Sequence, residues 1–409
     1  MTQGPLAGIR VIEFGAIGPV PFCAMLLADM GADVVQVGRP GPRREARFDV
    51  TLRGRRVITL DLKRDQDKAA ALALIGRADI LLEGNRPGVM ERLGLGPDAC
   101  RARNSRLVYG RMTGWGQDGP LAPTAGHDIN YIALTGALHA IGPAQGGPVP
   151  PLNLVGDYGG GAMFLAFGVL CALLEARGSG KGQVVDAAMV DGAATLMSLF
   201  CGLRARGAWT DRRGSNMLDG GAPWYATYET ADGKHVAVGA LEEPFWQELL
   251  LRLGIAPGAL PPREDHAGWE GIRAALALAF RRRDRDEWAA IFRDSDACVS
   301  PVMNLAEAVD HEHLTARGCF IDLDGVTQPA PVPRFSRTPG HAHPAADGPE
   351  VAAAVFAEWG ASPRPDAEAR GPATTGTAAV STVLVRPGQD GAAPPPPPFP
   401  DTASKEEEE

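Results

Sequence analysis

The chain has 409 residues, of which 45% are hydrophobic, and a formal net charge of −9 at pH 7. This length is enough to bury a large core and predicts two or three domains, while the acidic balance argues against nucleic acid or an anionic membrane surface as a partner. The six cysteines are scattered without a Cys-x-x-Cys pair, which is typical of reduced thiols in a cytoplasmic protein rather than of a disulfide framework.

The first residues carry no basic segment followed by an apolar run, so we expect no signal peptide. The longest apolar stretch, residues 162–174, is shorter than the roughly 20 residues that a spanning helix needs. We therefore expect a cytoplasmic protein that does not have a membrane as its partner.

Residues 9–82 alternate between short β-rich runs and helical segments. The expected strands are 9–14, 33–37, 57–60 and 79–82, and the expected helices are 19–30 and 64–77. Such alternation predicts a parallel, doubly wound sheet of the Rossmann-like α/β class. The first strand is not followed by Gly-x-Gly-x-x-Gly, and no Gly-x-x-x-x-Gly-Lys-[Ser/Thr] occurs, so the sequence does not support a nicotinamide or nucleoside triphosphate site.

The connection 38–56 is rich in arginine. Its arginines are Arg39, Arg43, Arg44, Arg47, Arg53, Arg55 and Arg56. A guanidinium group pairs bidentately with phosphate and stacks on adenine, so this loop could clamp a nucleotide. A solvated surface loop is an equally good interpretation.

A strand over 106–112 leads through a glycine-rich turn to His127, and Asp157 follows 30 positions later beside a second glycine-rich run. A helix that starts near Gly159 would present unpaired backbone N–H groups and the positive end of its dipole. An acid, a base and an anion-stabilising helix end are what proton transfer next to a carbonyl requires. Two plainer interpretations stay open, because Asp157 is also typical of a helix N-cap and His127 of a structural histidine.

A smaller α+β domain is expected in the second half of the chain. It begins with a β-hairpin, because Asp232-Gly233 separates two β-rich runs. From His127 on, the expected elements are helices at 129–140, 160–176 and 187–206, a strand at 183–186, strands at 224–230 and 235–239, and helices at 244–253, 269–282 and 285–293.

The expected domain boundaries follow from these elements. They are a first part of the large domain at 1–190, a linker at 191–223, the small domain at 224–325, a return to the large domain at 326–359 and a tail at 360–409. The tail has few large apolar side chains to offset the cost of ordering, which predicts disorder. The His-containing runs 310–313 and 341–343 lack the spacing of a ligand set, so we expect no metal.

Three long ungapped motifs carry a resemblance to a known family. They are Gly126-His127-Asp128-Ile129-Asn130-Tyr131, Pro151-Leu152-Asn153-Leu154 and Gly180-Lys181-Gly182-Gln183-Val184. They resemble the α-methylacyl-CoA racemase family, which belongs to the class III CoA-transferase (formyl-CoA transferase-like) superfamily, and the likeness runs from about Leu6 to about Thr338. The resemblance implies a large Rossmann-like domain, a smaller domain and a dimer of two interlocked copies.

The resemblance also implies residue roles. His127 and Asp157 would face opposite sides of C2 in a 2-methylacyl-CoA thioester, and Glu242 of one copy would reach His127 of the other. The residues that it assigns to the CoA thioester are Arg39, Leu60, Asp61, Leu62, Lys63, Arg86, Arg92, Gly126, Asp128, Ile129, Asn130 and Tyr131. We expect no metal, flavin or pyridoxal cofactor, since CoA enters as part of the substrate.

The expected activity is that of a racemase or epimerase, which interconverts R and S 2-methylacyl-CoA thioesters by 1,1-proton transfer through an enolate. The alternative is a class III CoA-transferase, in which Asp157 attacks the thioester as a nucleophile and CoA moves between carboxylic acids. A third hypothesis, a non-catalytic CoA-thioester-binding or scaffolding protein, is disfavoured by the joint presence of His127, Asp157 and Glu242.

Overall fold

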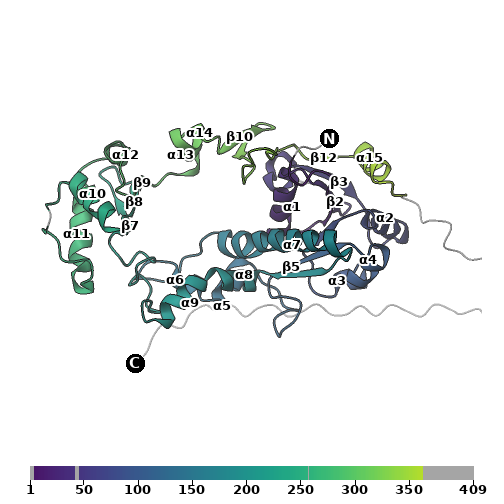
Figure 1. The fold of residues 1–409 in the computed structure, drawn as a ribbon, viewed down its shortest axis with the longest axis horizontal. Helices are drawn as coiled ribbons and strands as arrows, with labels where there is room; N and C mark the ends of the chain where they lie inside the picture. The colour runs from purple at the N-terminus through teal and green to yellow at the C-terminus, as the bar shows by residue number, and fades with distance from the viewer. Residues whose placement is uncertain (1–3, 42–45, 257, 363–409) are drawn as a thin grey trace, which may run out of the picture. The chain divides into compact units, whose positions relative to one another are not determined.

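The largest sheet of the protein has seven parallel strands (Figure 1). The structure is a computed structural model and describes residues 4–41, 46–256 and 258–362. Across the sheet, the strands are β12 (Ala346–Asp347), β3 (Arg55–Thr59), β2 (Asp33–Gly38), β1 (Arg10–Phe14), β4 (Ile80–Glu83), β5 (Val108–Thr113) and β6 (Val184–Ala188). Every neighbouring pair runs parallel, so the expected Rossmann-like α/β class is confirmed.

The order of the strands reverses between β1 and β4. The chain adds β2 and β3 on one side of β1, and it then returns to add β4, β5 and β6 on the other side. In doubly wound sheets, ligands bind at such a reversal, in the crevice outside the carboxyl ends of the strands. The loops that follow Phe14 and Glu83 therefore border the expected ligand crevice.

Helices accompany this sheet along the chain. They are α1 (Pro19–Asp29), α2 (Asp65–Ile75), α3 (Val89–Arg92), α4 (Pro97–Arg103), α5 (Asp128–Leu134), α6 (Ala137–Ala140), α7 (Met163–Ser179), α8 (Met189–Leu196), α9 (Ser198–Ala205) and α15 (Pro349–Trp359), with 3₁₀ turns at Ala46–Phe48 and Val50–Leu52.

Both faces of the sheet are covered, because its inner strands are apolar on both sides. Val11 of β1 packs into one hydrophobic core together with residues of α1 and α7. The next residue, Ile12, packs into a second core together with residues of α2 and α15. Successive side chains of a strand point to opposite faces, so the continuous apolar run of β1 places helices on both sides, as parallel sheets require.

Two segments that were expected as single helices are interrupted. The segment 187–206 begins with the last two residues of β6 and then contains α8 and α9, which are separated at Met197; the segment 129–140 contains α5 and α6, which are separated at Gly136. Gly136 has a φ of 84°, a left-handed conformation that glycine adopts without strain and that commonly ends a helix.

The most apolar helical run is continuous from Leu154 to Ser179, because a π-helix (Leu154–Ala162) leads directly into α7. These 26 residues, with a mean hydropathy of 1.8 in their most apolar window, are long and apolar enough to cross a membrane by length and composition. The expectation that no apolar segment reaches such a length is therefore wrong. Half of that window is buried within the protein, and α7 packs on β5 (Figure 1), which is the environment of a core helix.

A second group of elements, which we call the small region, surrounds a three-stranded antiparallel sheet. Its strands are β7 (Tyr225–Glu229), β8 (His235–Gly239) and β9 (Val299–Pro301), and its helices are α10 (Glu243–Leu253), α11 (Trp269–Phe280) and α12 (Arg285–Phe292), with a 3₁₀ turn at His266–Gly268. The hairpin turns at Asp232-Gly233. A core of its own, which includes Trp246, Phe280 and Trp288, fills the space between this sheet and its helices.

The chain returns to the large sheet after the small region. On the way it forms α13 (Leu305–Val309), α14 (Glu312–Ala316), and the antiparallel pair β10 (Phe320–Leu323) and β11 (Val326–Pro329). Arg53 then donates hydrogen bonds to Gln328 Oε1 (3.0 Å) and to the Pro329 carbonyl oxygen (2.6 Å). The predicted tail lies, from residue 363 on, outside the described residues.

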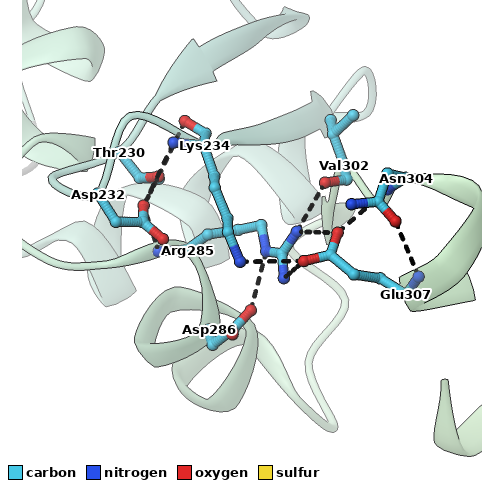
Figure 2. Close-up of polar contacts among 8 residues, drawn as sticks. All are labelled: Thr230, Asp232, Lys234, Arg285, Asp286, Val302, Asn304 and Glu307. Carbon is cyan, nitrogen blue, oxygen red and sulfur yellow. Dashed lines mark hydrogen bonds and ion pairs between the residues drawn. The ribbon is translucent and has the colours of Figure 1, made fainter. Parts of the chain in front are cut away.

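Arg285 connects separate segments of the small region with the segment that follows β9, and its guanidinium group is buried (Figure 2). It pairs with Asp286 (2.8 Å) and Glu307 (2.8 Å) and donates to the Val302 carbonyl oxygen (3.0 Å). Its backbone N–H group donates to Asp232 Oδ1 (3.2 Å). The Arg285 side chain is only 4% exposed, so its charge depends on these partners for compensation.

Arg285→Met should lower the Tm at pH 7 by about 3–6 °C, because it removes the centre of this network. Hydrogen bonds from Arg285 and Lys234 hold the pKa of Glu307 well below its usual range. The stabilisation is therefore present above the unfolded pKa of about 4.3 and is lost as the pH falls through the folded pKa. Thermal scans of both proteins between pH 3 and pH 7 measure the effect.

Arg293→Met is the matched control. Arg293 pairs with Glu312 where the two side chains are 63% and 80% exposed, and such surface pairs contribute little. Equal losses of Tm in the two variants would show that burial of the Arg285 network is not what stabilises this region.

Candidate active site

A pocket of about 350 Å³, which we call the first pocket, lies at the carboxyl ends of β1, β4 and β5. It is lined by residues 17–20, 84–87 and 112–115, which follow these three strands, and by His127, Tyr131 and Asp157. The structure thus brings together the two titratable residues that the sequence singled out. It does so beside the reversal of strand order, where ligands of doubly wound folds bind.

Asp157 lies inside the first turn of the π-helix. The helical run begins at Leu154, with Asn153 at its N-cap, so it does not start near Gly159, and the N-cap interpretation of Asp157 is wrong. The N–H groups at positions 157 and 158 donate to Asp128 and to the Asn153 carbonyl oxygen, so they do not serve as the anion-stabilising helix end that was expected. π-Helices are rare in proteins, but those that occur are often found at functional sites.

Three neighbours hold Asp157, one through its backbone and two through its carboxylate. The Asp157 N–H group donates to Asp128 Oδ2 (2.7 Å), and Asn153 Nδ2 donates to Asp157 Oδ2 (3.2 Å). Gly18 has a φ of 71°, and a Cβ atom there would lie 3.0 Å from Asp157 Oδ2. Because Asp128 directly follows His127, its hydrogen bond links the two titratable residues of the pocket.

The surroundings of Asp157 raise the pKa of its carboxyl group. Burial is the largest cause, since partial removal from water disfavours the charged form. The hydrogen bond from Asn153 and the charge of His127 lower the pKa, and the charge of Asp128 raises it. The net upward shift favours the neutral carboxyl group, which can donate a proton.

His127 is held through its backbone while its side chain stays exposed. It occupies the N-cap position of α5; its N–H group donates to Asn130 Oδ1 (3.0 Å), and its carbonyl oxygen accepts from the Asn130 N–H group (2.8 Å). On the other side, the Tyr131 hydroxyl donates to the Gly126 carbonyl oxygen, and the Tyr131 ring packs edge-on against Trp115. The imidazole is therefore positioned by a rigid turn and is free to contact a ligand in the pocket.

A second pocket, of about 480 Å³, lies at the carboxyl ends of β1, β2 and β3. Asn85 lines both pockets, so the two share a wall. Of the residues assigned to CoA by resemblance, Arg39, Leu60, Asp61, Leu62, Lys63 and Arg92 line the second pocket, and Arg86, Gly126 and Tyr131 line the first. Within the described residues, Asp128, Ile129 and Asn130 are not part of either lining.

Three arginines of the connection 38–56 form internal ion pairs. These pairs are Arg53 with Asp29 (2.6 Å), Arg55 with Glu13 (3.0 Å) and Arg56 with Asp33 (2.5 Å). Arg53 and Arg55 are only 4% and 1% exposed, so the phosphate-clamp interpretation is wrong for this part of the loop.

The other arginines of this connection differ in their surroundings. Arg39 is exposed and lines the second pocket. Among the described arginines of this connection, no other lines the first or the second pocket. Arg47 lies over the ring of Phe48. Arg43 and Arg44 lie outside the described residues.

Glu242 lies at the N-cap position of α10, three residues after β8, and its side chain is exposed. It is not among the described residues that line the first pocket. The expectation that it reaches His127 of a second copy stays a prediction.

Two neighbours of the Asp157 carboxylate, Asn153 and Gly18, were not predicted from the sequence. Asn153 lies four residues before Asp157, a spacing that brings two side chains together on one side of a helical turn. This four-residue spacing is informative only if both residues belong to the helix, and the sequence predicted a helix start near Gly159 instead of Leu154. Gly18 lies in the loop after the first strand, where sequence alone does not show which side chain it approaches.

The sequence profile of CoA-transferase family III matches residues 6–353. The chain is 45% identical over 335 residues to an α-methylacyl-CoA racemase of Mus musculus, which covers 82% of this chain and 87% of that one. It is 44% identical over 346 residues to an α-methylacyl-CoA racemase of Homo sapiens, with 82% and 90% covered. A crystal structure of a CAIB/BAIF family protein from Brucella suis has a TM-score of 0.76 at 25% identity and covers 87% of this chain and 100% of that one.

Asp157→Asn should raise the Tm at pH 7 by about 1–2 °C. Because the pKa of Asp157 is raised by folding, the folded state binds this proton more tightly, and the ionised carboxylate costs stability above the unfolded pKa of about 3.9. The gain should therefore be absent near pH 4 and grow as the pH rises through the folded pKa. Thermal scans between pH 4 and pH 8 measure it.

Asp118→Asn serves as the control, since Asp118 is exposed and is not among the described residues that line the first pocket. Its Tm should follow that of the wild type at each pH. A lower Tm for Asp157→Asn at neutral pH would mean that the carboxylate stabilises the fold and that burial does not dominate its surroundings.

Proposed function

Because the chain belongs to CoA-transferase family III, we propose that it is a racemase that interconverts the R and S forms of 2-methylacyl-CoA thioesters. The observation that carries this proposal is that His127 and Asp157 line one pocket at the carboxyl ends of parallel strands. The racemases of Mus musculus and Homo sapiens, at 45% and 44% identity over most of the chain, support the choice of substrate.

The proposed reaction is a 1,1-proton transfer at C2, the carbon next to the thioester carbonyl. One residue of the pair removes the C2 proton, and the electrons of the broken C–H bond pass to the carbonyl oxygen to form an enolate. The other residue, which is already protonated, delivers its proton to the opposite face of C2, and the carbonyl bond re-forms. The two groups exchange roles in the reverse direction.

Opposite protonation states are a requirement of this chemistry, since one group must accept a proton while the other holds one. The raised pKa of Asp157 supports this assignment, because burial makes its neutral form easier to populate. From the family resemblance, we assign the histidine to the S substrate and the aspartate to the R substrate.

The CoA part of the substrate is proposed to occupy the second pocket. Arg39, Lys63 and Arg92 line that pocket and carry positive charge toward it, which suits the phosphates of CoA. Because Asn85 lines both pockets, a thioester that extends past Asn85 would bring its C2 atom to His127 and Asp157. The CoA part then binds the substrate to the protein and takes no part in the proton transfer itself.

A second copy of the chain is proposed to cover one face of α7. Met163, Phe167 and Leu174 share that face by their spacing, and their side chains are 52%, 69% and 74% exposed. Such apolar surface is typical of an interface. Glu242 of the second copy would then reach His127 and orient the imidazole. A monomer in light scattering at micromolar concentration would contradict this part of the proposal.

The CoA-transferase alternative rests on the family name. In that reaction the Asp157 carboxylate attacks the thioester carbonyl and CoA leaves as its thiolate, which then attacks the Asp157 carbonyl of the mixed anhydride and releases the first carboxylate. A second carboxylate then attacks the Asp157 thioester, and the thiolate that it displaces attacks the acyl carbon of the new anhydride, which frees Asp157, so the reaction requires a carboxylic acid as acceptor. The need for an acceptor therefore separates the two functions experimentally.

Incubation of single enantiomers of a 2-methylacyl-CoA in deuterium oxide, without a carboxylic acid, tests the proposed function. The wild type should racemise the substrate and place one deuterium at C2, as measured by chiral chromatography and mass spectrometry. His127→Gln and Asp157→Asn should each lose racemisation by about 10²–10⁴-fold, because inversion needs a group on each face. Each variant should still exchange the C2 proton of the enantiomer that its remaining group faces.

His139→Gln is the matched control for the histidine variant. His139 is exposed on α6, and its Nε2 atom bonds to the Asp211 carbonyl oxygen (2.7 Å), so full activity is expected. Deuterium exchange that appears only after a carboxylic acid is added would reject the racemase in favour of the transferase.

Arg39→Ala should raise the KM for a CoA thioester by about tenfold and leave kcat nearly unchanged, because it removes a charge-assisted contact to a part of the substrate that does not react. The same variant should match the wild type on an N-acetylcysteamine thioester, which has no phosphates. Steady-state kinetics on both substrates measure the difference. An unchanged KM for the CoA thioester would remove Arg39 from the proposed CoA site.

A further inference from the structure

Glu242 lies in a turn that its own side chain does not secure. It occupies the N-cap position of α10 without a side-chain cap, and its carboxylate has no hydrogen bond or ion pair within the described residues. Its carbonyl oxygen accepts from the Trp246 N–H group (3.0 Å), which belongs to the helix itself. The direction in which this carboxylate points therefore depends on what fixes the backbone from residue 240 to residue 243.

The Arg263 guanidinium group supplies that restraint. Its Nη1 atom donates to the carbonyl oxygens of Leu241 (2.8 Å) and Ala240 (3.3 Å), and its Nη2 atom pairs with Glu243 Oε2 (2.5 Å). These acceptors lie on both sides of Glu242 in the sequence. A planar guanidinium can bind several acceptors in one fixed geometry, so Arg263 spans the turn that joins β8 to α10.

Arg263 is itself held rigidly. Its guanidinium lies over the rings of Trp224 (5.1 Å to the centroid) and Trp246 (5.5 Å), which are 6% and 5% exposed. Its carbonyl oxygen accepts a hydrogen bond from Trp269 Nε1 (2.8 Å). The Arg263 side chain is 14% exposed, so it is fixed between aromatic rings on one side and the turn on the other.

We propose that Arg263 is a positioning residue for the proton-transfer reaction, because it fixes the turn that presents Glu242 to His127 of a second copy. This inference rests on the proposed function. If the turn loosens, the Glu242 carboxylate samples many positions, and the imidazole of the partner loses its orientation. Substrate binding in the two pockets is unaffected, since Arg263 is not among the described residues that line either one.

The test compares Arg263→Met, Arg263→Lys, Glu242→Gln and the double variant Arg263→Met/Glu242→Gln in the full-length protein. The substrate is a single enantiomer of a 2-methylacyl-CoA, and kcat, KM and the pH profile of kcat/KM are measured. Arg263→Met should lower kcat by about 10-fold or more, as loss of a group that orients a histidine does at metal sites, with KM within about twofold of the wild type. The kcat of Arg263→Lys should lie between that of Arg263→Met and that of the wild type, because lysine keeps the positive charge but lacks the planar fork of arginine.

A merely structural role would not reproduce two further results. The pH profile of Arg263→Met should shift in the same direction as that of Glu242→Gln. In the Glu242→Gln background, Arg263→Met should cause no further loss of kcat, since the group that it positions is already absent.

Arg252→Met is the matched control. Arg252 lies on α10, the helix that follows Glu242, pairs with Glu248 (2.6 Å) and donates to the Ile291 carbonyl oxygen (2.5 Å), but it does not contact the turn at Glu242. It should lower the Tm to a similar extent and leave kcat unchanged. Thermal scans of all variants accompany the kinetics.

The outcomes separate this inference from the proposed function. Additive losses in the double variant, or an equal loss of kcat in Arg252→Met, overturn the positioning role and leave the racemase proposal standing. Wild-type kcat in Glu242→Gln overturns the role of Glu242, and the inference fails with it. Non-additive loss at unchanged KM supports both.

Discussion

The hydrogen bond from the Asp157 N–H group to the Asp128 carboxylate (2.7 Å) determines how the candidate site is assembled. It joins two segments that lie about 30 residues apart in the sequence, and its acceptor directly follows His127. Asp128 is 7% exposed, and a Cβ atom at Gly156 would lie 2.4 Å from Asp128 Oδ2, so only glycine allows the turn to approach this closely. A single buried contact therefore places an imidazole and a carboxyl group on the walls of one pocket.

The sheet explains where that pocket can be. The reversal of strand order between β1 and β4 opens a crevice at the carboxyl ends of the strands, and loops from both sides of the reversal line the two pockets, with Asn85 common to both. The buried pairs of Arg53 with Asp29 and Arg55 with Glu13 come from the same connection as Arg39 but do not line these pockets. They compensate charge inside the fold, which removes those arginines from contact with ligands.

Much of the fold could be predicted from the sequence, because parallel strands and their connecting helices leave a strong periodic signal. Strands β1 to β6 of the large sheet, the hairpin at Asp232-Gly233 and the meeting of His127 with Asp157 are examples, whereas β12 was not predicted. The start of the helix at Leu154 could not be predicted, since a glycine-rich run usually marks a loop and π-helices are rare. Nor could the sequence divide the arginines of one loop into buried pairs and pocket residues, because their partners at positions 13, 29 and 33 are defined only by the packed sheet.

The π-helix has a consequence for how this site can change during evolution. Its wider turn contains one residue more than an α-helical turn, so the direction of Asp157 depends on the number of residues between Leu154 and Ala162 as much as on their identity. Deletion of one residue there would restore α-helical pairing and rotate the preceding segment by about 100° relative to α7. Substitutions can adjust the pocket gradually, whereas a change in length would separate the carboxylate from the imidazole in one step.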